Sequence, residues 1–87
     1  MKTIWKYLLD SDNVVLSMPS GADILSVQTQ NDGICLWARV SPDAPATTRR
    51  FRIAPTGRWI DFEMISFLGT VQQFNGSLVW HIFEVEP

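Results

Sequence analysis

The chain has 87 residues, which leaves room for one hydrophobic core, so we predict a single domain over residues 1–87. Seven Lys and Arg against nine Asp and Glu give a formal net charge of −2, which argues against general nucleic-acid binding. No stretch approaches the roughly 18 apolar residues of a membrane span, so we expect a cytoplasmic protein with no membrane partner.

Short runs of β-branched and aromatic residues, with a period of two and turn residues between them, predict an all-β or mainly β fold. We expect about five to seven short antiparallel strands in a small sandwich or partly open barrel. The expected strands, in chain order, are Thr3–Leu9, Val14–Met18, Ile24–Gln30, Ile34–Val40, Thr47–Ile53, Phe67–Phe74 and Ser77–Val85.

The residues between these runs predict how the strands connect. Asp32-Gly33, which follows Asn31, and Asn75-Gly76 stand between alternating segments, and such pairs favour the positive-φ turns of a β-hairpin. The first two strands, joined by Asp10–Asn13, are expected to form a hairpin as well. Residues 58–65 are ambiguous, because aromatic residues three apart fit either one short helix or an irregular loop pinned by aromatic side chains.

Side-chain alternation predicts which faces are buried. The strand Ile34–Val40 carries apolar residues on both faces, which indicates a central strand. In the strand Thr47–Ile53, Phe51 alternates with Arg50 and Arg52, so the ring is expected to face the core and the two arginines to face away.

No combination of residues makes a recognisable catalytic site. Cys35 is the only cysteine, which excludes an internal disulfide, and its apolar neighbours indicate a buried side chain. His81 is the only histidine, which excludes a multi-histidine metal site, and its apolar strand face favours a structural role over catalysis. We therefore expect a protein that is not an enzyme and holds no metal or cofactor.

The basic segment that ends at Trp59 is the one candidate binding site. Arg50 and Arg52 share a strand face, and the turn at Thr56-Gly57 offers a hydroxyl and backbone amides to an anion. Trp59 can stack on a flat group such as a base. The alternative is a solvated arginine face with Trp59 closing the core. The candidate ligand-binding residues are Arg50, Arg52, Thr56, Gly57, Arg58 and Trp59.

Several short motifs extend over nearly the whole chain. They are Met1-Lys2-Thr3-Ile4-Trp5-Lys6-Tyr7, Met18-Pro19 with Gly21-Ala22 and Ile24-Leu25-Ser26-Val27-Gln28, Cys35-Leu36-Trp37-Ala38, Pro42, Ala44-Pro45, Arg50-Phe51-Arg52-Ile53, Thr56-Gly57, Gly69-Thr70 with Gln72, and His81-Ile82-Phe83-Glu84. With these motifs the chain resembles a family of small proteins encoded by bacteriophages and prophages. One departure is Arg58, where members of that family tend to carry histidine.

The resemblance implies a genetic setting, the infected bacterial host, and no particular reaction. The first expected function is a host-defence antagonist, a homo-oligomer that sequesters an anionic, nucleotide-like signal at the basic segment. The alternative is an inhibitor that grips a host defence enzyme through exposed aromatics such as Trp5 or Trp37. A minor virion or assembly component is a third possibility. The local concentration of charge favours the first function, and the few charges on a small aromatic-rich domain favour self-association.

Overall fold

Seven strands and no helix make up the computed structural model, which covers residues 1–87. Each strand lies within one or two residues of its predicted bounds, so the all-β prediction is confirmed. The strands are β1 (Thr3–Leu9), β2 (Asn13–Pro19), β3 (Asp23–Gln30), β4 (Gly33–Val40), β5 (Ala46–Pro55), β6 (Ser66–Gln73) and β7 (Leu78–Val85). No helix is therefore present that is long and apolar enough to cross a membrane.

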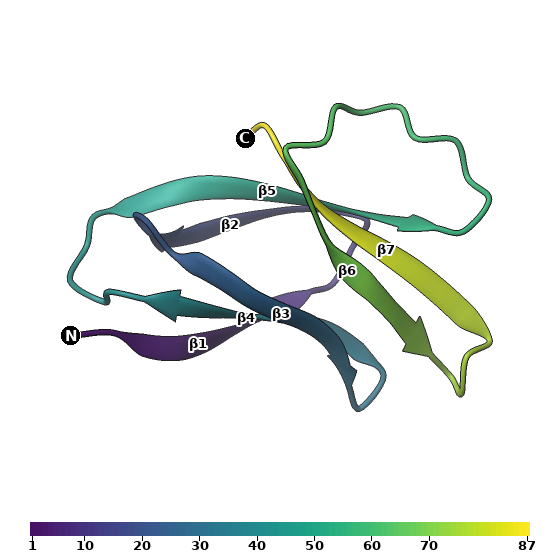
Figure 1. Cartoon of the computed structure of the whole chain (residues 1–87), viewed down its shortest axis with the longest axis horizontal. Helices are drawn as coiled ribbons and strands as arrows, with labels where there is room; N and C mark the ends of the chain where they lie inside the picture. Colours follow the sequence, from purple (N-terminus) through teal and green to yellow (C-terminus); the bar gives the residue numbers. More distant parts are fainter.

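The strands form two antiparallel sheets, a three-stranded sheet in the order β1-β4-β3 and a four-stranded sheet in the order β2-β5-β7-β6. Figure 1 shows the two layers, with β2 and β5 above β1, β3 and β4. The edge strands β3 and β6 lie against each other, but no ladder joins them, so the fold is a sandwich and not a closed barrel. Strand β4 is central in its sheet, as its two apolar faces predicted.

The core lies between the two sheets and is filled by the inward side chains of both. The largest fully buried side chains are Met18, Leu36, Val40, Phe51 and Ile82. Phe51 faces the core as predicted, and Cys35 is also buried, at 3% exposure. The period of two therefore identified the buried faces correctly.

Two of the predicted hairpins are present. Strands β3 and β4 pair through a turn in which Asn31 and Asp32 both have positive φ, which is the conformation that a type I′ turn requires. Strands β6 and β7 pair through a longer turn with positive φ at Phe74, Asn75 and Gly76.

The predicted hairpin between the first two strands is wrong. Strand β1 pairs with β4 and strand β2 pairs with β5, so the two strands belong to different sheets. Leu9 and Val14 are both buried in the core, one from each layer, and residues 10–12 carry the chain across. None of these connecting residues has the positive φ that a tight hairpin turn needs.

Residues 58–65 form an irregular loop, which was one of the two structures that the sequence allowed. Phe62 fixes this loop to the outer face of the four-stranded sheet, where it packs on Ala54, Phe83 and Val85. The rings of Phe62 and Phe83 meet edge to face, with centroids 5.6 Å apart. One aromatic side chain thus anchors a segment that has no regular backbone pairing of its own.

Candidate functional site

Three of the predicted arginines gather beside the segment that leads into β2. The Arg52 Nε donates a hydrogen bond to the carbonyl of Asp12 at 3.2 Å, and an Arg58 nitrogen lies 3.8 Å from the Asp12 carboxylate. The Arg50 guanidinium donates to the Asn13 side-chain oxygen at 3.0 Å. The structure therefore brings the three arginines to one corner of the four-stranded sheet.

Two carboxylates accompany these arginines and offset much of their charge. Asp12 lies against Arg58, and Asp61 lies 3.7 Å from Arg52. The guanidinium of Arg52 also stacks over the Phe62 ring, 4.5 Å from its centroid, which ties Arg52 to the 58–65 loop. Arg50 is the only one of the three arginines without a carboxylate partner, so an anion entering this corner would compete with acids already there.

Thr56 and Gly57 form the predicted turn, but the hydroxyl is already engaged. The Thr56 Oγ1 lies 2.7 Å from the His81 Nε2, and the Thr70 Oγ1 lies 3.0 Å from the His81 Nδ1. His81 is half-buried and both of its imidazole nitrogens have hydroxyl partners, which agrees with the structural role that its strand face predicted. Gly57 has a φ of 93°, and a Cβ there would meet no neighbour, so backbone conformation alone selects glycine.

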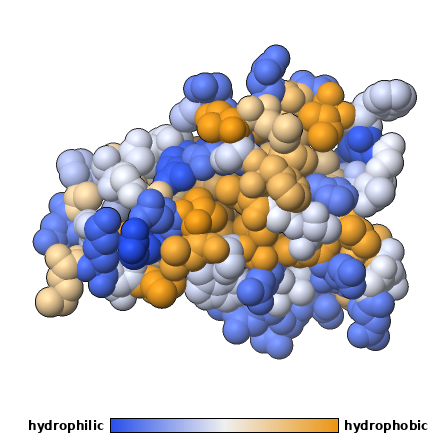
Figure 2. All heavy atoms as spheres, viewed as in Figure 1, coloured by the Kyte–Doolittle hydropathy of each residue, from blue (hydrophilic) through white to orange (hydrophobic).

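Trp59 is 93% exposed, so the idea that it closes the core is wrong. It belongs to a group of large apolar residues that follow the Thr56-Gly57 turn, each about half exposed or more. We call this group the apolar loop surface: Trp59, Ile60, Met64, Ile65 and Phe67. Figure 2 shows apolar side chains at this loop and across the middle of the same face, where β3 and β6 lie side by side in Figure 1.

Sequence reasoning missed this surface, because residues 58–65 lack the period that separates buried from exposed positions. It named Trp5 and Trp37 as docking aromatics instead. Trp37 is half-buried on β4, so it is poorly placed to anchor a partner, and Trp5 is 41% exposed. The usable signal was local: six large apolar residues within the nine positions 59–67, without strand or helix periodicity.

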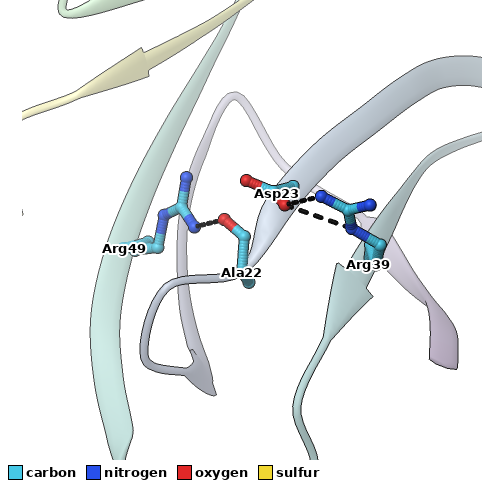
Figure 3. Close-up of polar contacts among 4 residues, drawn as sticks. All are labelled: Ala22, Asp23, Arg39 and Arg49. Atoms are coloured by element: carbon cyan, nitrogen blue, oxygen red, sulfur yellow. Dashed lines mark hydrogen bonds and ion pairs between the residues drawn. The ribbon is translucent and has the colours of Figure 1, made fainter. Parts of the chain in front are cut away.

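Arg49, adjacent to the candidate arginines, is structural. Its guanidinium forms two 2.7 Å hydrogen bonds with the Glu84 carboxylate, and Figure 3 shows it reaching the Ala22 carbonyl. The hydrogen bonds that Arg49 donates to Glu84 raise the pKa of Arg49 above its ordinary value. Beside it, the guanidinium of Arg39 holds the pKa of Asp23 below its usual range. These contacts join β5 to β7 and the start of β3 to β4.

A hollow of about 340 Å³ opens near the same corner, at one end of the sandwich. Five of its ten lining residues are apolar, and two are aspartates. The lining residues are Leu8, Leu9, Asp10, Ser11, Asp12, Gly33, Ile34, Ile53, Gln73 and Trp80. Asp10 and Asp12 would repel an anion, so this hollow does not extend the predicted anion site.

The chain belongs to the family described as a domain of unknown function (DUF7352), which it matches over residues 1–87. No curated protein and no solved structure matches the chain.

Proposed function

We propose that this protein binds a host protein through the apolar loop surface, with Trp59 as the anchor. The observation that carries the proposal is the exposure of Trp59, at 93%. Exposing a tryptophan and four further large apolar side chains on this loop and the adjoining start of β6 is unfavourable for an isolated chain, and such surfaces mark interaction sites. Tryptophan is also among the residues that most often dominate binding energy at protein interfaces.

The loop is held in place before any partner binds. Phe62 packs into the cluster of Ala54, Phe83 and Val85, and Phe67 contacts the same Phe83 ring at a centroid distance of 5.5 Å. A loop that is already fixed loses less conformational entropy on binding than a free one. The anchored loop therefore suits a rigid docking surface.

Charges beside the surface indicate the chemistry of the partner. Glu63 is exposed and forms no ion pair, and Asp61 is exposed with one partner at 3.7 Å. Arg58, the cation of the loop, lies against Asp12. Glu63 is thus the one charge of the loop without an ion-pair partner, and a Lys or Arg at the edge of an apolar pocket on the host protein would match it.

The resemblance to small phage and prophage proteins supports a setting for this binding. In that setting the protein acts in the cytoplasm of an infected bacterium as an accessory inhibitor of a host defence protein. The proposal assigns no reaction to the chain, because inhibition by docking needs none.

The test uses a photo-crosslinking amino acid in place of Ile60, with the same amino acid in place of Leu25 on β3 as the control. We expect a host protein to crosslink from position 60 and not from position 25. Trp59→Ala should weaken binding of that purified protein by about 30-fold or more, whereas Leu25→Ala should leave it unchanged. Equal affinity of Trp59→Ala and the unmodified protein would overturn the proposal, as would identical crosslinking from both positions.

Sequestration of an anionic, nucleotide-like signal is a second candidate, favoured by the absence of a carboxylate partner for Arg50. Arg52 and Arg58 add charge beside it, and the exposed Trp59 ring can stack on a base. Native mass spectrometry of protein purified from signal-producing cells tests this candidate. A bound nucleotide would appear as a mass excess that denaturation removes, and a clean apo mass would count against it.

A further inference from the structure

Strand β1 is an edge strand whose free side has no backbone partner in the chain. Its ladder to β4 is continuous over all seven residues, and the strand contains neither proline nor glycine. Ile4, Trp5 and Leu8 are large, apolar and exposed along it. A regular, apolar edge of this kind is a template for pairing with another strand.

Lysine on an edge strand ordinarily discourages such pairing, because its charged side chain projects past the free edge. The Lys6 side chain does not project past that edge. Its ammonium donates a 2.8 Å hydrogen bond to the Gln30 side chain on β3. Because β4 lies between β1 and β3, the Lys6 side chain extends across the sheet and away from the free edge. The only charged side chain of β1 therefore leaves the edge unguarded.

The other three edges differ from β1. Strands β3 and β6 each carry a register shift, between Ile24 and Ser26 and between Phe67 and Gly69, and they cover each other. Strand β2 ends at a proline and exposes only one large apolar residue, Val15. Bulges, covering and proline are the usual protections of sheet edges, and β1 has none of them.

We propose that two copies of the chain pair through β1 in antiparallel orientation, which joins their three-stranded sheets into one six-stranded sheet. The occupant is a second copy because the strand is complementary to itself in one register. With Trp5 opposite Trp5 of the second copy, Ile4 lies opposite Lys6 and Thr3 lies opposite Tyr7. The two rings then form a cross-strand aromatic pair. The register shifted by one residue in each copy places Lys6 opposite Lys6, where the like charges repel.

This dimer goes beyond the proposed function and does not depend on it. Strand β1 lies in the three-stranded sheet, at the lower margin of Figure 1, whereas the apolar loop surface lies between β5 and β6. Both surfaces can therefore be occupied together. A dimer would present two loop surfaces and would bind a multimeric host protein with increased avidity.

Cysteine crosslinking tests the register directly. In the proposed dimer the Cα atoms of residue 5 in the two copies lie about 4.5–5.5 Å apart, a separation that a disulfide spans. The residues at position 3 lie about four strand positions apart, or roughly 14 Å. We expect Trp5→Cys to form a covalent dimer under mild oxidation and Thr3→Cys to remain largely monomeric. Because Cys35 is buried, we expect the unmodified protein to form no disulfide-linked dimer on the same denaturing gel.

Sedimentation of the unmodified protein provides the second measurement. We expect a dimer at micromolar concentration, a monomer for Trp5→Lys, and an unchanged dimer for Leu25→Lys on β3. A purely monomeric protein would overturn the proposal, as would equal crosslinking of Trp5→Cys and Thr3→Cys. Neither result would bear on the loop surface, because crosslinking from Ile60 measures that surface independently.

Discussion

Arg49 of β5 and Glu84 of β7 are joined by two hydrogen bonds of 2.7 Å. The residues that precede and follow each of them in its strand point to the opposite side of the sheet. The side chains are only 20% and 13% exposed. The adjacent Arg50 contacts one exposed amide oxygen. Two consecutive arginines thus have different roles, one in holding the sheet and one at its surface.

Arg49→Ala should lower the free energy of unfolding by about 2–4 kcal/mol, because it leaves a largely buried carboxylate without its partner. Arg50→Ala, the matched control, should change it by no more than about 0.5 kcal/mol. Urea unfolding of both variants measures the difference. Equal effects would show that the Arg49–Glu84 pair contributes no more than a surface contact.

The strands and two hairpins were predictable because their signals are local. Alternation along β5 places Phe51 inside and Arg50 outside, and turn residues such as Asp32 carry the positive φ that ends a strand. Strand partners are not local. The residues after Leu9 are typical of a turn, whether the next strand pairs with β1 or belongs to the other sheet. The chain changes sheets because Leu9 and Val14 are both buried in the core from opposite layers.

The candidate site was only partly predictable for the same reason. Alternation showed that Arg50 and Arg52 share a face, but it did not show which acids fold against them. Asp12 lies 40 residues before Arg52 in the sequence, and its carbonyl contacts the guanidinium only through the pairing of β2 with β5. Of the two aromatic residues in the 58–65 loop, Phe62 packs on the sheet and Trp59 is exposed, and their spacing in the sequence does not show which of the two is anchored.

The Arg50→Ala, Arg52→Ala double variant separates a binding site from a solvated arginine face. Loss of the Arg52 stack on Phe62 should cost about 0.5–1 kcal/mol of stability, which leaves the fold intact. If both arginines hold an anion, affinity should fall about a hundredfold or more, since each charge-assisted hydrogen bond is worth roughly 1.5–3 kcal/mol. Calorimetry with a panel of linear and cyclic nucleotides, beside thermal unfolding, measures both quantities. Unchanged affinity would exclude these arginines as the site.

Gly69→Ala should destabilise the sandwich where β6 of one layer packs against β3 of the other. A Cβ at position 69 would lie 2.7 Å from the Val27 Cγ2 of the other sheet, so the packing of β3 against β6 would have to shift. Gly69 also has a φ of 154°, which alanine adopts only with strain, so the loss of about 1–3 kcal/mol expected from overpacking comes in addition to backbone strain. Gly21→Ala is the control, because Gly21 has a φ of 78° and open space around it. Backbone strain alone should lower the free energy of unfolding of Gly21→Ala by about 1 kcal/mol. Chemical denaturation of both variants tests whether Gly69→Ala loses more than this, as the close contact with Val27 predicts.

Tyr7, the only tyrosine, is expected to make stability depend on alkaline pH. Its hydroxyl is buried without a hydrogen-bond partner, and burial raises its pKa above the ordinary value of 10.0. The folded state therefore favours the neutral phenol. The stability that comes from keeping the phenol neutral is complete below the pKa of Tyr7 in the unfolded state. It is lost as pH rises through the higher pKa of Tyr7 in the folded state.

Tyr7→Phe removes both the unpaired hydroxyl and its ionisation. We expect the free energy of unfolding at neutral pH to stay unchanged or to rise by up to about 1 kcal/mol. Above the unfolded pKa, the unmodified protein should lose stability relative to Tyr7→Phe. Ultraviolet titration of the single phenol gives the folded pKa directly, and urea unfolding at neutral and alkaline pH gives the stabilities. An ordinary phenol pKa together with a destabilised Tyr7→Phe variant would mean that the hydroxyl has a favourable partner in solution.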